Sequence, residues 1–397
     1  MFDTEAPVGP PPLELAVFDR LHDALQSGGP AQAIDALIAQ LREAGHFDAL
    51  FYALLMRKRL ELGVPPFPSG PATDIPEQHH DAYEDAIRQA GREVGGIYLS
   101  RNDLAHAWVY YRMLGEPQPV MDALDAANPA PDADVQPLID IALYQGVHPK
   151  RGFDLIVERY GICNAITTLS SQDFSRQPDV HEHCTKRLVQ SLADQLAERL
   201  RSDIAAHDKP TPPESATIPE LLAGNAELFA EGAYHIDLSH LSAVIQFAMQ
   251  LPDCPERKLA RQLCQYGQQL TTPFQSEGNP PFEKLYHDAE IFFQVLDGEQ
   301  VDAGIAHFHA KAEAAQVDGE IYPAEVLVNL LVRIGRTEEA LATAKQFLAA
   351  VPEGQLSCPG VYELAKRVGD WATIESVARE RRDAIQFLAA KLAQVRA

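Results

Sequence analysis

Two histidines and an aspartate lie close together in the middle of the chain, at His235, Asp237 and His240. Neutral imidazole nitrogens and a carboxylate form a ligand set that zinc, manganese or iron accepts. His287, further along the chain, is a fourth candidate ligand for the same ion. These four residues predict a site for a divalent transition metal, which would serve a helical enzyme of the hydrolase or isomerase class.

The same segment has a second interpretation, because an apolar helical pattern begins at Leu241. Asp237 or Ser239 is a natural N-cap for that helix. His235 and His240 then form local hydrogen bonds instead of binding an ion. The spacing is not the HExxH type of a helical zinc site, which favours the capping interpretation.

A second group of chemically useful residues surrounds Pro149. Pro149 suits the first position of a helix that Gly161 ends, so Lys150 and Arg151 fall in its first turn. The helix dipole disfavours cations at that end. Together with His148, these two cations predict a site for an anion or for the carboxylate of a partner. The alternative is that they pair with acids on the protein's own surface.

The overall composition narrows the classes of function. The 397 residues carry 57 acids against 33 bases, a formal net charge of -24. Such a surface repels phosphate, which argues against nucleic acids and anionic membranes as partners. No run approaches the roughly 18 apolar residues of a membrane span, and the first residues lack the pattern of a secretory signal. The five cysteines form no CxxC pair, so we expect reduced thiols and a cytoplasmic protein.

Apolar residues recur at helical spacing along most of the chain, and no convincing β-strand pattern is found, so the predicted class is all-α. A helix beginning at Leu13 is ended by Gly28-Gly29-Pro30, and others follow over 31–44 and 47–62. The longest spans about 180–206, with an apolar residue at every fourth position from 188 to 204. A last helix over 377–397 is predicted to cover the end of the core, and docking on a partner is its alternative role. The residues on its apolar side are Ile385, Leu388, Ala389 and Leu392.

Two segments carry a pattern beyond generic helix pairing. In each, large apolar residues precede a turn, a small residue follows it, and a large residue comes next. In 323–352 the pattern is formed by Leu327, Leu331, Gly335, Ala340 and Phe347, and Pro352 ends it. In 91–115 the corresponding residues are Val94, Gly95, Tyr98, Ala107 and Tyr111. Both segments resemble the tetratricopeptide repeat (TPR), a helix–turn–helix unit of about 34 residues. Two further segments match in part. Near Gly298 the polar residues Glu290 and Gln294 stand at apolar positions, and near Gly369 the large Ile374 stands at a small one.

The resemblance implies stacked antiparallel helical hairpins, a TPR-like α-solenoid with irregular segments. Its concave groove would bind a protein, a peptide or an anionic ligand, and Arg92, Asn329 and Arg333 would line it. We expect four parts: a flexible lead over 1–12, an N-terminal helical segment over 13–64, a repeat-like domain over 77–207 and a C-terminal TPR-like domain over 217–397. An interaction scaffold without catalytic activity is favoured slightly over the metal-dependent enzyme, and the sequence leaves the oligomeric state open.

Overall fold

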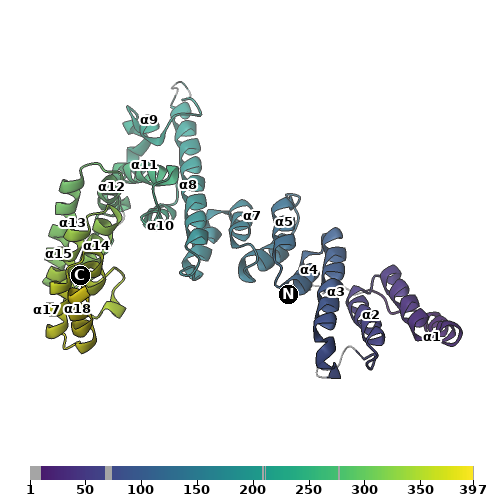
Figure 1. The fold of residues 1–397 in the computed structure, drawn as a ribbon. Helices are drawn as coiled ribbons and strands as arrows, with labels where there is room; N and C mark the ends of the chain where they lie inside the picture. The colour runs from purple at the N-terminus through teal and green to yellow at the C-terminus, as the bar shows by residue number, and fades with distance from the viewer. Residues whose placement is uncertain (1–9, 68–73, 208–209, 211, 276–277, 397) are drawn as a thin grey trace. The chain divides into compact units, whose positions relative to one another are not determined.

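The computed structural model describes residues 10–67, 74–207, 210, 212–275 and 278–396. These residues form helices and connecting loops without a β-strand, which confirms the all-α prediction (Figure 1). None of the described helices is long and apolar enough to cross a membrane. Three parts of the predictions lie outside the described residues: residues 1–9 of the expected lead, residues 208, 209 and 211 between the two expected domains, and residue 397 of the expected last helix.

The chain divides into two compact units, Met1–Arg159 and Tyr160–Ala397. The boundary falls within α7 (Pro149–Ser171), whose helical path is broken at Gly161 by a φ of 78°. The helix end predicted at this glycine is confirmed. The segment 77–207, expected as one domain, spans the boundary between the two units.

The first unit begins with a helical hairpin. Its helices, besides the first part of α7, are α1 (Leu15–Ala44), α2 (Phe47–Glu61), α3 (His80–Ser100), α4 (Leu104–Leu114), α5 (Gln118–Ala126) and α6 (Gln136–Ile139). Within α1 the path is broken at Gly29, where φ is 77° and ψ is −175°. Arg20 donates a hydrogen bond to Gln40 at 2.8 Å, so the first half of α1 folds back on the second. The predicted break at 28–30 is therefore confirmed.

The second unit is a series of helices in which neighbours along the chain pack on each other (Figure 1). After the end of α7 its helices are α8 (Pro178–Ala206), α9 (Ile218–Leu222), α10 (Leu238–Ala248), α11 (Pro255–Gln269), α12 (Leu285–Leu296), α13 (Val301–Gln316), α14 (Tyr322–Arg333), α15 (Thr337–Phe347), α16 (Val361–Val368), α17 (Trp371–Glu380) and α18 (Ala384–Arg396). The apolar stripe predicted for the longest helix is buried along α8, which packs on α9, α10 and α11.

The two segments with the repeat-like pattern are both helix pairs, α3 with α4 and α14 with α15. The small residues at their contacts, Ala107 and Ala340, have no exposed surface. A methyl group added at Gly95 on α3 would lie 2.9 Å from the ring of Tyr111 on α4, closer than carbon atoms pack. Small residues therefore set how closely the paired helices approach, as the sequence pattern predicts.

The C-terminal end differs from the prediction in two respects. The expected single helix over 377–397 is interrupted between α17 and α18, where Arg382 has a φ of 57°. The face expected to cover the core is instead exposed, with Ile385 80% and Leu388 57% accessible. Ala390 is buried in its place. The predicted covering role is therefore wrong for that face, because the helix presents its other side to the protein.

We predict that Ala340→Leu lowers the free energy of unfolding by about 1–3 kcal/mol, because the added atoms enter a fully packed helix contact. The matched control is Ala342→Leu on the same helix, where the alanine is exposed and the change is expected within about 0.5 kcal/mol. Urea titration followed by circular dichroism measures both. Equal stability of the two variants would contradict the close helix contact.

Candidate functional site: a groove in the second unit

A groove with a volume of about 1200 Å³ opens between the C-terminal end of α10, the start and middle of α12, and one face of α14. Residues of the loops at 278–282 and 357 complete its walls. The residues that line it are Gln246, Phe247, Met249, Gln250, Gly278, Asn279, Phe282, Leu285, Phe292, Tyr322, Val326, Asn329, Arg333 and Ser357. The site is therefore assembled from segments up to 111 residues apart in the sequence (246 to 357).

The floor of the groove is aromatic and rigid. Phe282 and Phe292 are 8% and 5% exposed, and their ring centroids lie 6.0 Å apart in an edge-to-face arrangement. Both rings also contact the fully buried Phe308 of α13, at 5.8 and 5.9 Å. Edge-to-face clusters of this kind hold each ring in one orientation. The floor is thus a fixed apolar surface that needs no rearrangement to receive an apolar side chain.

The rim of the groove carries uncharged amide side chains. Gln246, Gln250 and Asn279 are exposed, and Asn329 on α14 is half-buried. The Asn329 amide nitrogen donates to the carbonyl of Ser357 at 3.3 Å, which leaves its oxygen directed elsewhere. A carboxamide offers both hydrogen-bond donors and an acceptor. The rim can therefore bond to both polar groups of a peptide backbone.

Arg333 lies one turn after Asn329 and links α14 to α10. Its guanidinium donates to the carbonyl of Met249 and, at 2.5 Å, to the carbonyl of Leu251. Met249 is the C-cap of α10 and Leu251 follows two residues later, at the end of the helix where its dipole favours a cation. Partial burial and the positive charge of Arg257 lower the pKa of Arg333 to about 10. The side chain therefore remains protonated at neutral pH and brings one positive charge to the groove.

Glu325, one turn before Asn329, fixes the loop on the far wall. Its carboxylate is buried and accepts a hydrogen bond from the backbone N–H of Ser357 at 2.7 Å. Burial, and then the charge of Glu325, raise the pKa of the neighbouring Cys358 thiol to about 12. The thiol is therefore protonated at neutral pH, which makes it a poor nucleophile.

Of the residues predicted for a ligand-binding groove, Asn329 and Arg333 come together. Arg92 lies in the first unit, where its guanidinium forms a two-bond contact with Glu116 at 2.6 and 2.9 Å. This pair joins α3 to the turn after α4. Its geometry matches the planar guanidinium to the carboxylate, so Arg92 is engaged within the hairpin.

The predicted anion site at the start of α7 is occupied by the protein's own groups. Arg151 donates to the carbonyls of Leu124 and Ala127 at 3.4 and 3.1 Å, at the end of α5, and lies 3.5 Å from Glu158. His148 is 3.1 Å from a carboxylate oxygen of Asp125, and Lys150 also has a partner. The cations disfavoured at the start of α7 thus interact with the end of another helix. This geometry supports the alternative of internal pairing.

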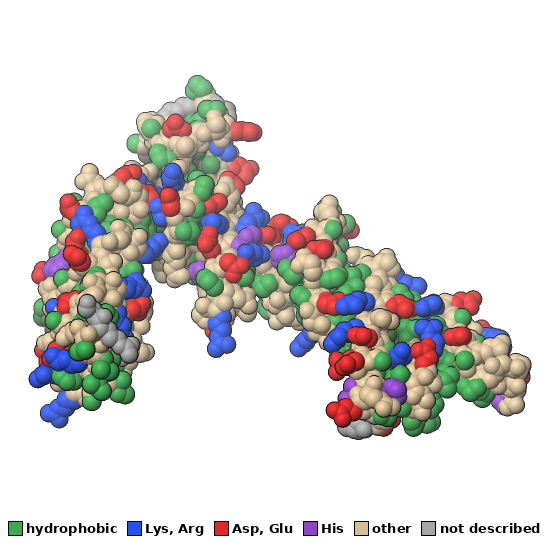
Figure 2. All heavy atoms as spheres, in the orientation of Figure 1, with side chains coloured by type: hydrophobic (Ala, Val, Ile, Leu, Met, Phe, Trp, Pro, Cys, Tyr) green, Lys and Arg blue, Asp and Glu red, His purple; other side chains and the backbone are tan. Residues whose placement is uncertain are grey.

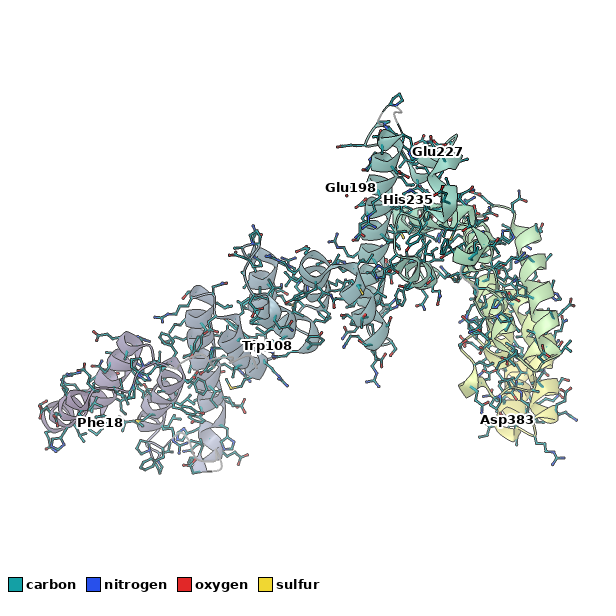
Figure 3. The ribbon with its side chains drawn as sticks, turned by 180° about the vertical axis from the view of Figure 1, so that it is seen from behind. Phe18, Trp108, Glu198, Glu227, His235 and Asp383 are labelled. Carbon is teal, nitrogen blue, oxygen red and sulfur yellow. The ribbon has the colours of Figure 1, made fainter. Side chains whose placement is uncertain are left out.

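The structure does not gather the predicted metal ligands. His235, which is labelled in Figure 3, is buried. One of its ring nitrogens lies 3.1 Å from Asp203 of α8 and the other 3.2 Å from the Tyr266 hydroxyl of α11. Asp237 is the N-cap of α10 and accepts from the backbone N–H groups of Ser239 and His240. The described residues contain no group of three or more histidine, cysteine or acidic side chains able to hold a metal ion.

The fourth predicted ligand, His287, is exposed on α12. Its ring packs against His307 of α13 with centroids 6.1 Å apart. His307 in turn lies 2.8 Å from the buried carboxylate of Asp288, which also accepts from Lys311 at 3.1 Å. These contacts tie α12 to α13.

Comparisons with known proteins add no further assignment. No family model matches the chain, and no matching curated protein or solved structure was found.

We predict that Glu325→Ala lowers the free energy of unfolding by about 1–3 kcal/mol, because the Ser357 N–H loses its acceptor. Glu325→Gln retains an amide oxygen at the same place and is expected to restore most of the loss. Thermal unfolding measures the stability, and hydrogen exchange across 353–360 reports whether the loop loosens. Unchanged exchange in the alanine variant would refute the role given to Glu325.

Proposed function

We propose that this chain is a helical-repeat interaction protein, with TPR-like hairpins, that binds a protein or peptide segment in the groove between α10, α12 and α14. The observation that carries the proposal is the combination of a fixed aromatic floor and a carboxamide rim in one groove of about 1200 Å³. Pockets for small ligands have volumes of about 300–1000 Å³. The larger size of this groove favours a segment of polypeptide over a small molecule.

The composition of the walls supports the choice of a peptide. An apolar side chain of the partner is expected to pack against Phe282 and Phe292, where it loses contact with water. The amides of Asn279 and Asn329 are expected to bond to the partner's backbone. Arg333 uses one N–H of each terminal nitrogen for the carbonyls of Met249 and Leu251, and its remaining N–H groups can donate to a carboxylate of the partner.

The experiment is a selection of peptides from a random displayed library on the full-length protein, followed by affinity measurement with a synthetic peptide. Tyr322→Ala and Asn329→Ala are each expected to weaken binding by about 5-fold or more, which corresponds to about 1 kcal/mol per truncated contact. Tyr322 is 50% exposed at the edge of the groove, so its loss leaves the core intact.

Tyr144→Ala is the matched control, because Tyr144 is 54% exposed in the first unit. Its affinity for the peptide is expected to equal that of the unmodified protein. If the selected peptides bind equally well to all three variants, the groove is not their binding site. If no peptide is enriched at all, the proposed function is overturned.

A further inference from the structure

The last described helix exposes an apolar stripe. Its members recur at intervals of three, four and three residues, and we call them the α18 stripe: Ile385, Leu388, Leu392 and Val395. They are 80%, 57%, 57% and 85% exposed, in the same order. Figure 2 shows hydrophobic side chains at the surface of the region formed by α17 and α18. Single exposed apolar residues are ordinary, but four aligned at this spacing form the seam of a helix that pairs with another helix.

The first half of α1 carries a stripe with the same spacing. We call it the α1 stripe, and its members are Leu15, Phe18, His22 and Leu25. The three apolar members are 83%, 58% and 44% exposed, and Phe18 is labelled in Figure 3. Val17, on another face of this helix, is buried, whereas the stripe is exposed.

These stripes depart from what stacked helical proteins require. The outermost helices of such proteins normally present a polar outer face, which keeps the stack soluble. Exposed apolar stripes rather mark surfaces where another helix docks, with anchors at i, i+3 and i+7. The matched spacing makes each stripe a suitable partner for the other, because their members can then meet level by level. Three of the four levels carry an apolar residue on both helices, and His22 of the α1 stripe stands at the fourth.

The charges beside the two stripes are opposite. Residues 379–396 contain five bases and two acids, although the whole chain has a net charge of -24. Arg379 and Lys391 share the single carboxylate of Glu375, at 3.3 and 2.6 Å, so a positive charge remains beside the α18 stripe. Residues 14–28 contain three acids, Glu14, Asp19 and Asp23, against one base. The acidic helix that fits α18 is therefore present in the chain itself.

We propose that the α1 stripe of one copy of this chain packs against the α18 stripe of a second copy, with the two helices antiparallel. This orientation places Glu14 and Asp19, in the first turns of α1, beside the half of α18 that contains Lys391. It also sets the positive end of one helix dipole beside the negative end of the other. The contact joins two different surfaces. In a dimer, one copy therefore still has a free α18 stripe and the other a free α1 stripe. Association therefore continues into a chain of copies or closes into a ring.

The test is sedimentation velocity on the full-length protein over a range of concentrations, with Phe18→Asp and Leu392→Asp. Each substitution puts a carboxylate into one apolar seam at an exposed position, so the fold is expected to persist by circular dichroism. The unmodified protein is expected to associate as concentration rises, and each variant alone to remain monomeric. An equimolar mixture of the two variants is expected to form dimers and nothing larger, because one intact α18 stripe then meets one intact α1 stripe.

Val317→Asp serves as the control, since Val317 is 86% exposed outside both stripes and its substitution is expected to leave association unchanged. Association by Phe18→Asp alone would show that two α18 stripes pair symmetrically, which overturns the proposal. The proposal is also overturned if the mixture of the two variants stays monomeric, or if the unmodified protein is monomeric at every concentration. A different protein would then have to cover these stripes. The proposal is independent of the groove between α10 and α14.

Discussion

The close contact between paired helices at small residues is the constraint on which the rest of the molecule depends. Ala107 and Ala340 are buried completely, and Gly95 leaves space for the ring of Tyr111. In the second unit this contact draws α15 against α14, so that α14 is covered along most of its length and leaves only a narrow face open. That face carries Asn329 and Arg333, and the groove exists because the remaining sides of α14 are occupied.

The groove also shows how a few polar bonds fix a surface built from distant segments. Glu325, Asn329 and Arg333 follow each other at intervals of four residues on α14, and each bonds to the backbone of another segment. Backbone partners of this kind hold the walls in place without depending on the side chains of those segments. A binding surface held rigid in advance loses little conformational entropy when a partner arrives.

Local rules predicted most of the helices and their breaks. Gly29 and Gly161 interrupt helices where the sequence indicates, because only glycine readily adopts their positive φ. Asn329 and Arg333 were predictable from the repeat-like pattern of one hairpin. Phe282 was not predictable as part of the floor, because it lies in a loop without periodicity. The role of His235 was not predictable either, because the partners of this histidine lie about 30 residues away on either side.

One departure from the repeat-like pattern has its own consequence. Glu290 stands on α12 where an apolar residue is expected, and it accepts hydrogen bonds from Gln265 and Gln268 of α11 at 2.9 and 2.5 Å. A shift of α12 by one turn along α11 would leave these partly buried polar groups without hydrogen-bond partners, whereas a purely apolar contact would tolerate the shift. The carboxylate therefore fixes the register in which α12 packs against α11, and it makes each of the two helices specific for the other.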